Sequence, residues 1–208
     1  MHHFEDLRQQ KEASALGMWL FIAQEIMFFG GLFLIYTVYR TLNPHAFAEA
    51  SAHLDWKLGA INTAVLIGSS LTMAMAVHAA ASGQRKAITG WLVLTIVLGL
   101  VFLGIKVVEY AEKFEHHLVP GPHFRFEGPE AHAAQIFFSL YFAMTGLHAL
   151  HMIVGIPILA SMAWMAWRGR FSAEYHTPVE LTGLYWHFVD IIWIFLFPLL
   201  YLLGAHQA

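Results

Sequence analysis

Five apolar stretches, each long enough to cross a lipid bilayer, constrain the fold of this chain more than any other feature. A spanning helix needs about 20 mainly apolar residues to cross a hydrocarbon core of about 30 Å. Charged residues make up only 12% of the chain, against the roughly 25% that is usual in soluble domains. The sequence therefore predicts an all-α polytopic membrane helix bundle, in which residues 1–208 form a single membrane domain with five transmembrane helices at 16–39, 60–81, 88–110, 134–167 and 182–204.

The composition excludes several classes of cofactor and partner. The chain has no cysteine, so it cannot form disulfides, iron–sulfur clusters, blue-copper sites or thiolate zinc sites, because all of them need cysteine sulfur. A metal would have to rest on histidine or carboxylate ligands. The formal net charge of -3 offers no basic field that could hold nucleic acid. The expected partners are membrane lipids and other membrane proteins, and no nucleic acid.

Lysine and arginine in the short loops predict the orientation of the spans, because these residues are enriched on the cytoplasmic side of membranes. An inside N-terminus would place Arg8, Lys11, Arg85, Lys86, Arg168 and Arg170 on the inner side. The outer side would then hold Arg40, Lys57, Lys113 and Arg125. The inner set is larger and sits in the tighter loops. We therefore expect the N-terminus inside and the C-terminus outside.

A small set of ionisable residues lies inside the predicted spans, where each costs about 3 kcal/mol or more near the bilayer centre. Glu25 lies in the middle of the first span, and we expect it to be the most deeply buried acid. Lys106 and Glu109 are three residues apart near the end of the third span, where we expect them to pair at the interface or extend toward water. The buried polar sites that we predict are Glu25, Glu109, His148, His151, His187 and Asp190.

The histidines of the fourth and fifth spans allow two interpretations. His148, His151 and His187 could ligate a haem between facing helices, or could hold a metal together with a carboxylate. A buried histidine more often donates its ring N–H to a carboxylate or carbonyl group, and the carboxyl groups of Glu25 and Asp190 need such donors to offset their burial. We favour hydrogen bonding, with Glu25 contacting a histidine of the fourth or fifth span. Glu25 itself could handle protons or could simply join helices.

Short sequence phrases in all five spans follow one another in the order of a known family. They are GMWLFIAQEIMFF at residues 17–29, LGAINTAVL at 58–66, GIKVVEY at 104–110, TGLHALH at 145–151 and YWHFVDIIW at 185–193. Together they resemble subunit III of the haem-copper oxidases, and most of all cytochrome c oxidase subunit III in its five-helix bacterial form. The last of the five phrases is the most specific.

The resemblance implies an accessory subunit III of a proton-pumping cytochrome c oxidase in aerobic respiration. It implies no catalytic residue, no metal site and no redox centre in this chain, with haem and copper in partner subunits. The main contact would be oxidase subunit I, which the chain would stabilise and whose proton uptake it would support. Other oxidase subunits and a respiratory supercomplex are further expected partners.

Other functions stay open beside this one. Within the family, the alternatives are the third subunit of a quinol oxidase and an accessory protein of nitric oxide reductase. An alternative of another class is a free-standing histidine-ligated membrane cytochrome or metal protein. A transporter is the least favoured, because the spans show no pair of glycine- or proline-interrupted halves that would mark an inverted repeat.

The resemblance also implies structural phospholipids. In the family, phospholipids fill a cleft between helices, and the acid at the position of Glu25 is a membrane carboxyl group that reacts with hydrophobic carbodiimides. Longer members have seven helices, and this chain begins where their third helix would, so another chain or lipid is expected to supply the rest of the cleft wall. The five-helix form indicates a multi-pass protein of the bacterial plasma membrane. We expect lipid contacts at Trp19, Arg168, Arg170, His176 and Trp186.

Overall fold

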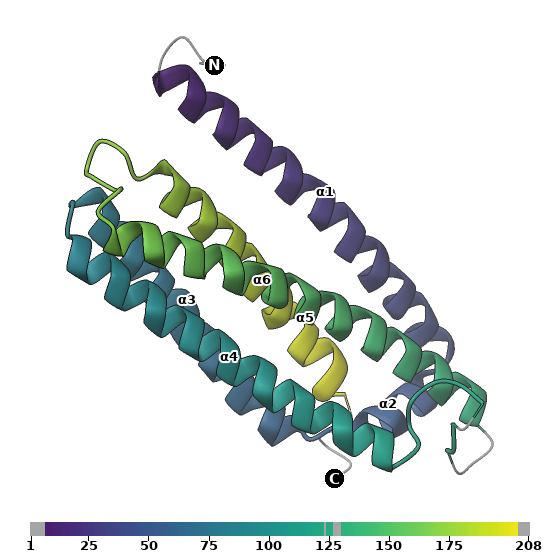
Figure 1. Cartoon of the computed structure of the whole chain (residues 1–208). Coiled ribbons are helices and arrows are strands. Elements are labelled where there is room, and N and C mark those ends of the chain that lie inside the picture. The colour runs from purple at the N-terminus through teal and green to yellow at the C-terminus, as the bar shows by residue number, and fades with distance from the viewer. Residues whose placement is uncertain (1–6, 123, 127–129, 204–208) are drawn as a thin grey trace.

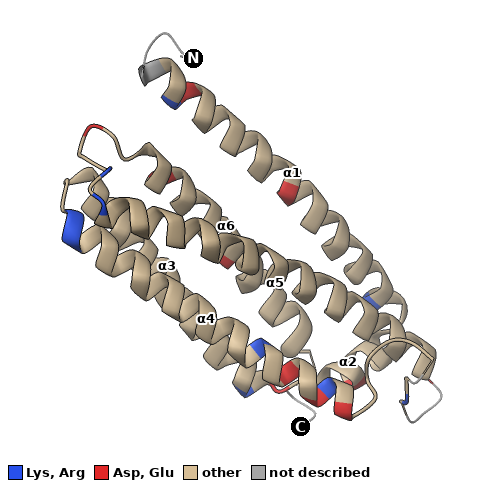
Figure 2. Cartoon of the chain, in the orientation of Figure 1, with Lys and Arg blue, Asp and Glu red and all other residues tan. Residues whose placement is uncertain are grey.

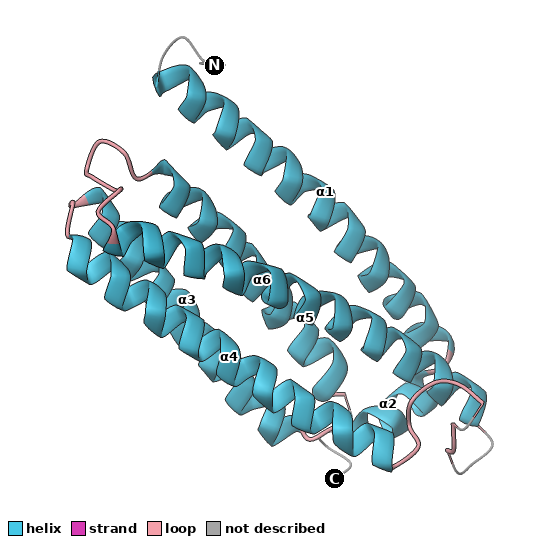
Figure 3. Ribbon diagram, in the orientation of Figure 1, coloured by secondary structure: helices cyan, strands magenta, loops and turns pink. Residues whose placement is uncertain are grey.

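The protein is built from α-helices. The structure, a computed structural model, describes residues 7–122, 124–126 and 130–203, and within these ranges it contains six helices and no strand (Figure 3). Five of the six are long and apolar enough to cross a membrane, which confirms the predicted all-α bundle of five spanning helices. The helices are α1 (Leu7–Leu42), α2 (Pro44–Ala52), α3 (Trp56–Ala81), α4 (Arg85–Glu115), α5 (Ala131–Trp167) and α6 (Thr177–Tyr201).

Helices α3 to α6 form an antiparallel four-helix bundle. In this bundle α3 and α5 each pack against both α4 and α6. Helix α1 packs against α5 and α6, and it diverges from them toward its N-terminus (Figure 1). Most charged residues lie near the two ends of the bundle, and few lie along its length (Figure 2). The divergence of α1 leaves the adjoining faces of α5 and α6 partly uncovered.

The spanning helices extend beyond the predicted apolar stretches. Helix α1 begins at Leu7, nine residues before the predicted start at position 16, and reaches Leu42. Its 36 residues make a rod of about 54 Å, which exceeds a whole bilayer of about 40–45 Å. Helix α1 must therefore tilt or project beyond one face of the membrane. The predicted end of the fifth span, Gly204, lies outside the described residues.

A short helix that was not predicted, α2, closes one end of the bundle. Asn43 and Pro44 begin it, and proline is well suited to a first helical position because it lacks the N–H that would have no partner there. The fully buried ring of Phe47 packs edge-on against Tyr36 of α1 and Phe137 of α5. Ser51 Oγ donates a hydrogen bond of 2.7 Å to the carbonyl of Leu200. Helix α2 thus ties the end of α1 to α5 and α6.

The centre of the bundle is filled by Trp186 of α6. A side chain at Gly99 of α4 or Gly155 of α5 would come within 3.0 or 2.9 Å of its ring, so both glycines make room for it. The indole Nε1 donates to Ser69 Oγ of α3 at 2.8 Å. Trp186 is fully buried, so the expectation that it contacts lipid is wrong. The Trp186 ring is therefore packed between its own helix, α6, and the helices α3, α4 and α5.

Candidate functional site

Glu25 of α1 faces His151 of α5, as expected for a carboxyl group inside the membrane. The Nε2 atom of His151 lies 3.3 Å from the Oε2 atom of Glu25, although this oxygen receives no hydrogen bond from the described residues. The other ring nitrogen of His151, Nδ1, lies 2.9 Å from the carbonyl of Leu147. An imidazole held between a carbonyl and a carboxyl group lowers the cost of placing Glu25 there. A histidine of the fourth span thus lies next to Glu25, as expected for the fourth or fifth span, but the expected hydrogen bond between them is not formed.

Glu25 is not the most deeply buried acid of the chain, which corrects the prediction. Its side chain is 12% exposed to solvent, whereas Glu109 and Asp190 are 1% and 2% exposed. The difference arises because α1 contacts the bundle along one side only, so that a residue on α1 retains an open flank. Glu25 is therefore accessible from outside the four-helix bundle.

A cavity of 430 Å³ lies beside His151, between α1, α5 and α6. Two of the residues that line it, Phe21 and Tyr185, pack against one another with ring centroids 5.9 Å apart, and the Tyr185 hydroxyl donates to the carbonyl of His151 at 2.9 Å. The walls are almost entirely apolar, which suits a hydrocarbon chain better than water or a polar solute. The lining residues are Met18, Phe21, Leu150, His151, Val154, Ile158, Leu181, Thr182 and Tyr185.

A second polar group, centred on Lys106 and Glu109 of α4, lies inside the four-helix bundle. The Lys106 ammonium group donates to Glu109 Oε2 at 3.0 Å, to the Tyr141 hydroxyl at 3.1 Å and to the Tyr201 hydroxyl at 2.9 Å. Both tyrosines donate in turn to Glu109 Oε1, at 2.6 and 2.5 Å. Lys106 and Glu109 pair as predicted. The prediction that they lie at the interface or extend toward water is wrong, because both are buried within the bundle.

Aromatic rings complete the surroundings of Lys106. The ammonium nitrogen lies 5.1 to 5.6 Å from the centroids of four rings, close enough for cation–π attraction. These rings belong to Tyr110, Tyr141, Trp193 and Tyr201. Sequence reasoning missed the two tyrosines that bond to the ion pair. A usable signal existed for Tyr141, because a tyrosine well inside a span, away from the interface, needs a hydrogen-bond partner there.

His148 of α5 packs between aromatic rings. Its ring centroid lies 5.3 Å from that of Phe102 and 5.1 Å from that of Trp193. Neither of its ring nitrogens has a hydrogen-bond partner among the described residues. His148 is almost fully buried, as predicted, but it pairs with no carboxyl group of the described chain.

His187 and Asp190 of α6 do not pair with the groups that were expected. Nδ1 of His187 lies 2.7 Å from the hydroxyl oxygen of Ser70 on α3. The Asp190 carboxyl group is almost fully buried, and both of its oxygens lack a hydrogen-bond partner in the part of the chain that the structure describes. The expectation that a histidine donates to Asp190 is therefore wrong. Nothing in the sequence pointed to Ser70, whose side chain reaches His187 from another helix.

The predicted lipid contacts are distributed over several elements. Trp19 is an exposed residue of α1. Arg168 and Arg170 follow the end of α5, and the Arg168 guanidinium group lies 5.1 Å from the ring centroid of Trp164. His176, at the start of α6, pairs with Glu180 at 3.1 Å. The structure does not bring these residues together at one site.

In the ranges that the structure describes, no three histidine, aspartate or glutamate side chains group as metal ligands would.

Comparisons with known proteins match nearly the whole chain. The family model described as cytochrome c oxidase subunit III matches residues 6–205. A cytochrome c oxidase subunit 3 of Synechocystis sp. is 32% identical over 97% of this chain and 78% of that protein. The protein of the same name from Thermostichus vulcanus is 34% identical over 90% of this chain and 86% of its own length. The one from Cyprinus carpio is 33% identical over 91% of this chain and 69% of its own length.

Proposed function

Because this chain belongs to the cytochrome c oxidase subunit III family, we propose that it is an accessory subunit without redox centres. It packs on oxidase subunit I, stabilises that subunit during turnover and supports proton uptake, while haem and copper reside in partner subunits. The observation that carries this role is the Glu25–His151 contact beside an apolar cavity between α1, α5 and α6. A site of this kind can hold a lipid chain next to a polar anchor, and that chain would fill the cavity.

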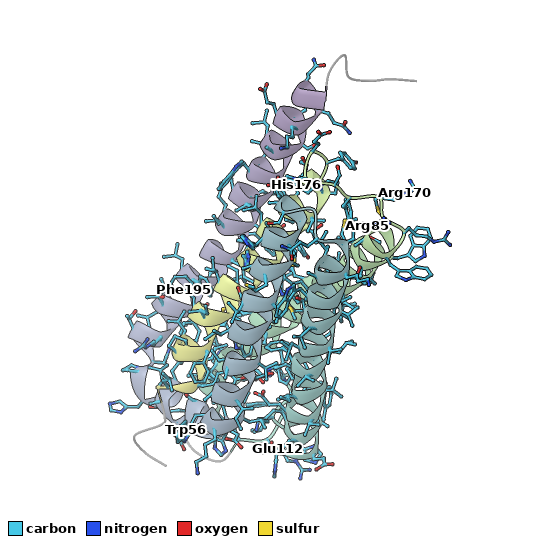
Figure 4. The ribbon with its side chains drawn as sticks, turned by 90° about the vertical axis from the view of Figure 1, so that its left-hand side faces the viewer. Trp56, Arg85, Glu112, Arg170, His176 and Phe195 are labelled. Atoms are coloured by element: carbon cyan, nitrogen blue, oxygen red, sulfur yellow. The ribbon has the colours of Figure 1, made fainter. Side chains whose placement is uncertain are left out.

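The site of action that we propose is the plasma membrane of a bacterium, with the N-terminus inside. The end of the bundle that carries Arg85, Arg170 and His176 lies opposite the end that carries Trp56 and Glu112 (Figure 4). The first of these ends holds the larger set of basic residues from the short loops, which favours the inner side. The chain would there contact oxidase subunits, structural phospholipids and a respiratory supercomplex.

We expect a Glu25→Ala variant of the complete oxidase to keep its haem content and its initial rate of oxygen reduction, and to inactivate after fewer turnovers. The reason is that the substitution removes the polar partner of His151 at the cavity and leaves the imidazole facing apolar surroundings. The measurement is the amount of oxygen consumed before activity is lost, together with the optical spectrum of the purified complex. His151→Ala should reproduce the effect.

Gln24→Ala is the matched control, because Gln24 is the neighbouring residue of α1 and its side chain is exposed. This control should inactivate like the unmodified oxidase. Loss of haem in Glu25→Ala would contradict the proposal by indicating a role in cofactor binding. Equal inactivation of the Gln24 and Glu25 variants would also contradict it.

A further inference from the structure

A second cavity lies where α4 begins and α5 ends. Its volume is 590 Å³, and it is lined by Arg85, Lys86, Thr89, Gly90, Ala166 and Trp167. It shares no lining residue with the apolar cavity beside His151. Unlike that cavity it is bordered by two cationic side chains. The proposed role of the oxidase subunit does not make use of it.

The basic side chains around this cavity are not neutralised by acids. Arg85, Lys86 and Arg168 form no ion pair within the ranges that the structure describes. Figure 2 shows basic residues at this end of the bundle, where α4 starts and α5 stops. The acid of the nearby loop, Glu174, lines a different cavity together with Lys11. The surroundings of the second cavity therefore favour an anion.

The Arg85 guanidinium group lies next to the end of α5. The backbone of Gly169 has a φ of +73°, and the space that a side chain would need there is occupied by the Arg85 guanidinium group. The exposed Arg85 side chain thus lies over Gly169 at the end of α5, and Lys86, which is also exposed, borders the same cavity. A guanidinium group has five N–H donors in a fixed plane, so one contact with the chain leaves others for an anion.

An exposed apolar strip of α4 begins next to the cavity. From Gly90 the same helical face carries Val93 and Val97, because residues three and four positions apart lie above one another. Both valines are exposed. On the α5 side the exposed rings of Trp164 and Trp167 lie under the Arg168 guanidinium group, at 5.1 and 5.7 Å, as tryptophans do at a membrane interface. A cationic pocket thus adjoins an apolar strip.

We propose that this cavity binds the phosphate of an anionic phospholipid, with an acyl chain lying along Val93 and Val97 of α4. Arg85 and Lys86 contact the head group, since hydrogen bonds between a cationic side chain and a phosphate are stronger than hydrogen bonds between neutral groups. The additional negative charge of the head group distinguishes this lipid from a zwitterionic one. The apolar strip distinguishes it from free phosphate, which could not use that surface. The site is separate from the phospholipid cavity of the proposed function and does not depend on it.

Native mass spectrometry of the delipidated full chain, titrated with phosphatidylglycerol or phosphatidylcholine, tests this site. In an Arg85→Gln/Lys86→Gln variant we expect one bound phosphatidylglycerol to be lost at saturation, through an affinity about tenfold lower or more, which corresponds to 1.4 kcal/mol. Phosphatidylcholine binding should be unchanged. Lys86→Gln alone should give a smaller loss, and it avoids disturbing the contact with Gly169. The exchange variant Arg85→Lys/Lys86→Arg should retain the lipid.

The matched control is Arg40→Gln/Lys57→Gln, which removes the same charge far from the cavity. It should bind phosphatidylglycerol like the unmodified chain. Three outcomes would overturn the proposal: an unchanged number of bound phosphatidylglycerols in both the double and the Lys86 variants, an equal loss in the control, or displacement of the lipid by excess inorganic phosphate. The last outcome would assign the pocket to a soluble anion. Far-UV circular dichroism of each variant shows whether its helices are intact.

Discussion

Replacing Lys106 with methionine is expected to destabilise the chain by about 3–5 kcal/mol, because it leaves a buried carboxylate without its counter-ion. The carboxyl group of Glu109 would keep the hydroxyl donors of Tyr141 and Tyr201, at 2.6 and 2.5 Å. Two neutral donors do not compensate a charge that has no access to water. Glu109→Met should be similarly harmful, because it strands the Lys106 ammonium group among aromatic rings.

The double variant Lys106→Met/Glu109→Met should recover most of the lost stability, since replacing a complete buried pair by apolar side chains is often neutral. Unfolding by a denaturing detergent in mixed micelles, followed by far-UV circular dichroism, measures the free energy of unfolding. Lys57→Met is the matched control: it removes an exposed lysine whose ammonium group lies over the Trp56 ring, and it should change stability by less than about 0.5 kcal/mol. A double variant as unstable as the two single ones combined would contradict this account.

Trp186→Ala is expected to cost about 3–5 kcal/mol, as other substitutions of fully buried tryptophans by alanine do. In a membrane, helices associate through van der Waals packing and interhelical hydrogen bonds, and the Trp186 side chain supplies both. Its removal opens a cavity between Gly99 and Gly155 and leaves the buried hydroxyl group of Ser69 without the indole donor.

Trp164→Ala provides the comparison for this prediction, because Trp164 of α5 is 53% exposed. It removes the same atoms at a position where lipid replaces them, so the expected loss is small. The same detergent unfolding assay measures both variants. Equal losses for Trp164 and Trp186 would show that the packing around Trp186 does not hold the bundle together.

The number of the spanning helices could be predicted because the bilayer sets the length of an apolar stretch. The ends could not, since a helix continues into polar sequence until a residue stops it, as the early start of α1 at Leu7 shows. Helix α2 was missed although Asn43 and Pro44 formed a readable start signal. Its nine residues are too few to show a clear helical period beside the longer spans.

The candidate site was predictable only where partners lie close in sequence. The spacing of Lys106 and Glu109 predicted their pairing, because residues three apart share a helix face. Which face points into the bundle depends on Tyr141 and Tyr201, which are 35 and 95 residues away from Lys106. The burial of Trp186 could not be predicted for the same reason, since the glycines that make room for its ring lie on other helices.

Glu25 shows which part of a buried polar site the sequence can predict. Its cost in the membrane predicted a histidine partner, and His151 lies 3.3 Å away. Asp190 has no histidine partner in the described structure, and His187 contacts the hydroxyl group of Ser70 instead. A buried carboxyl group indicates that a partner is needed, but only the packing of the helices decides which side chain can reach it.

The most direct test of the accessory role is to purify the tagged full chain from its own membranes in a mild detergent. The account predicts that a haem- and copper-containing oxidase subunit I co-purifies in a one-to-one ratio, and that the chain separated from it has no Soret absorption band. Mass spectrometry of the preparation and its optical spectrum supply both results. A chain that purifies without oxidase subunits and carries stoichiometric haem of its own would contradict the account.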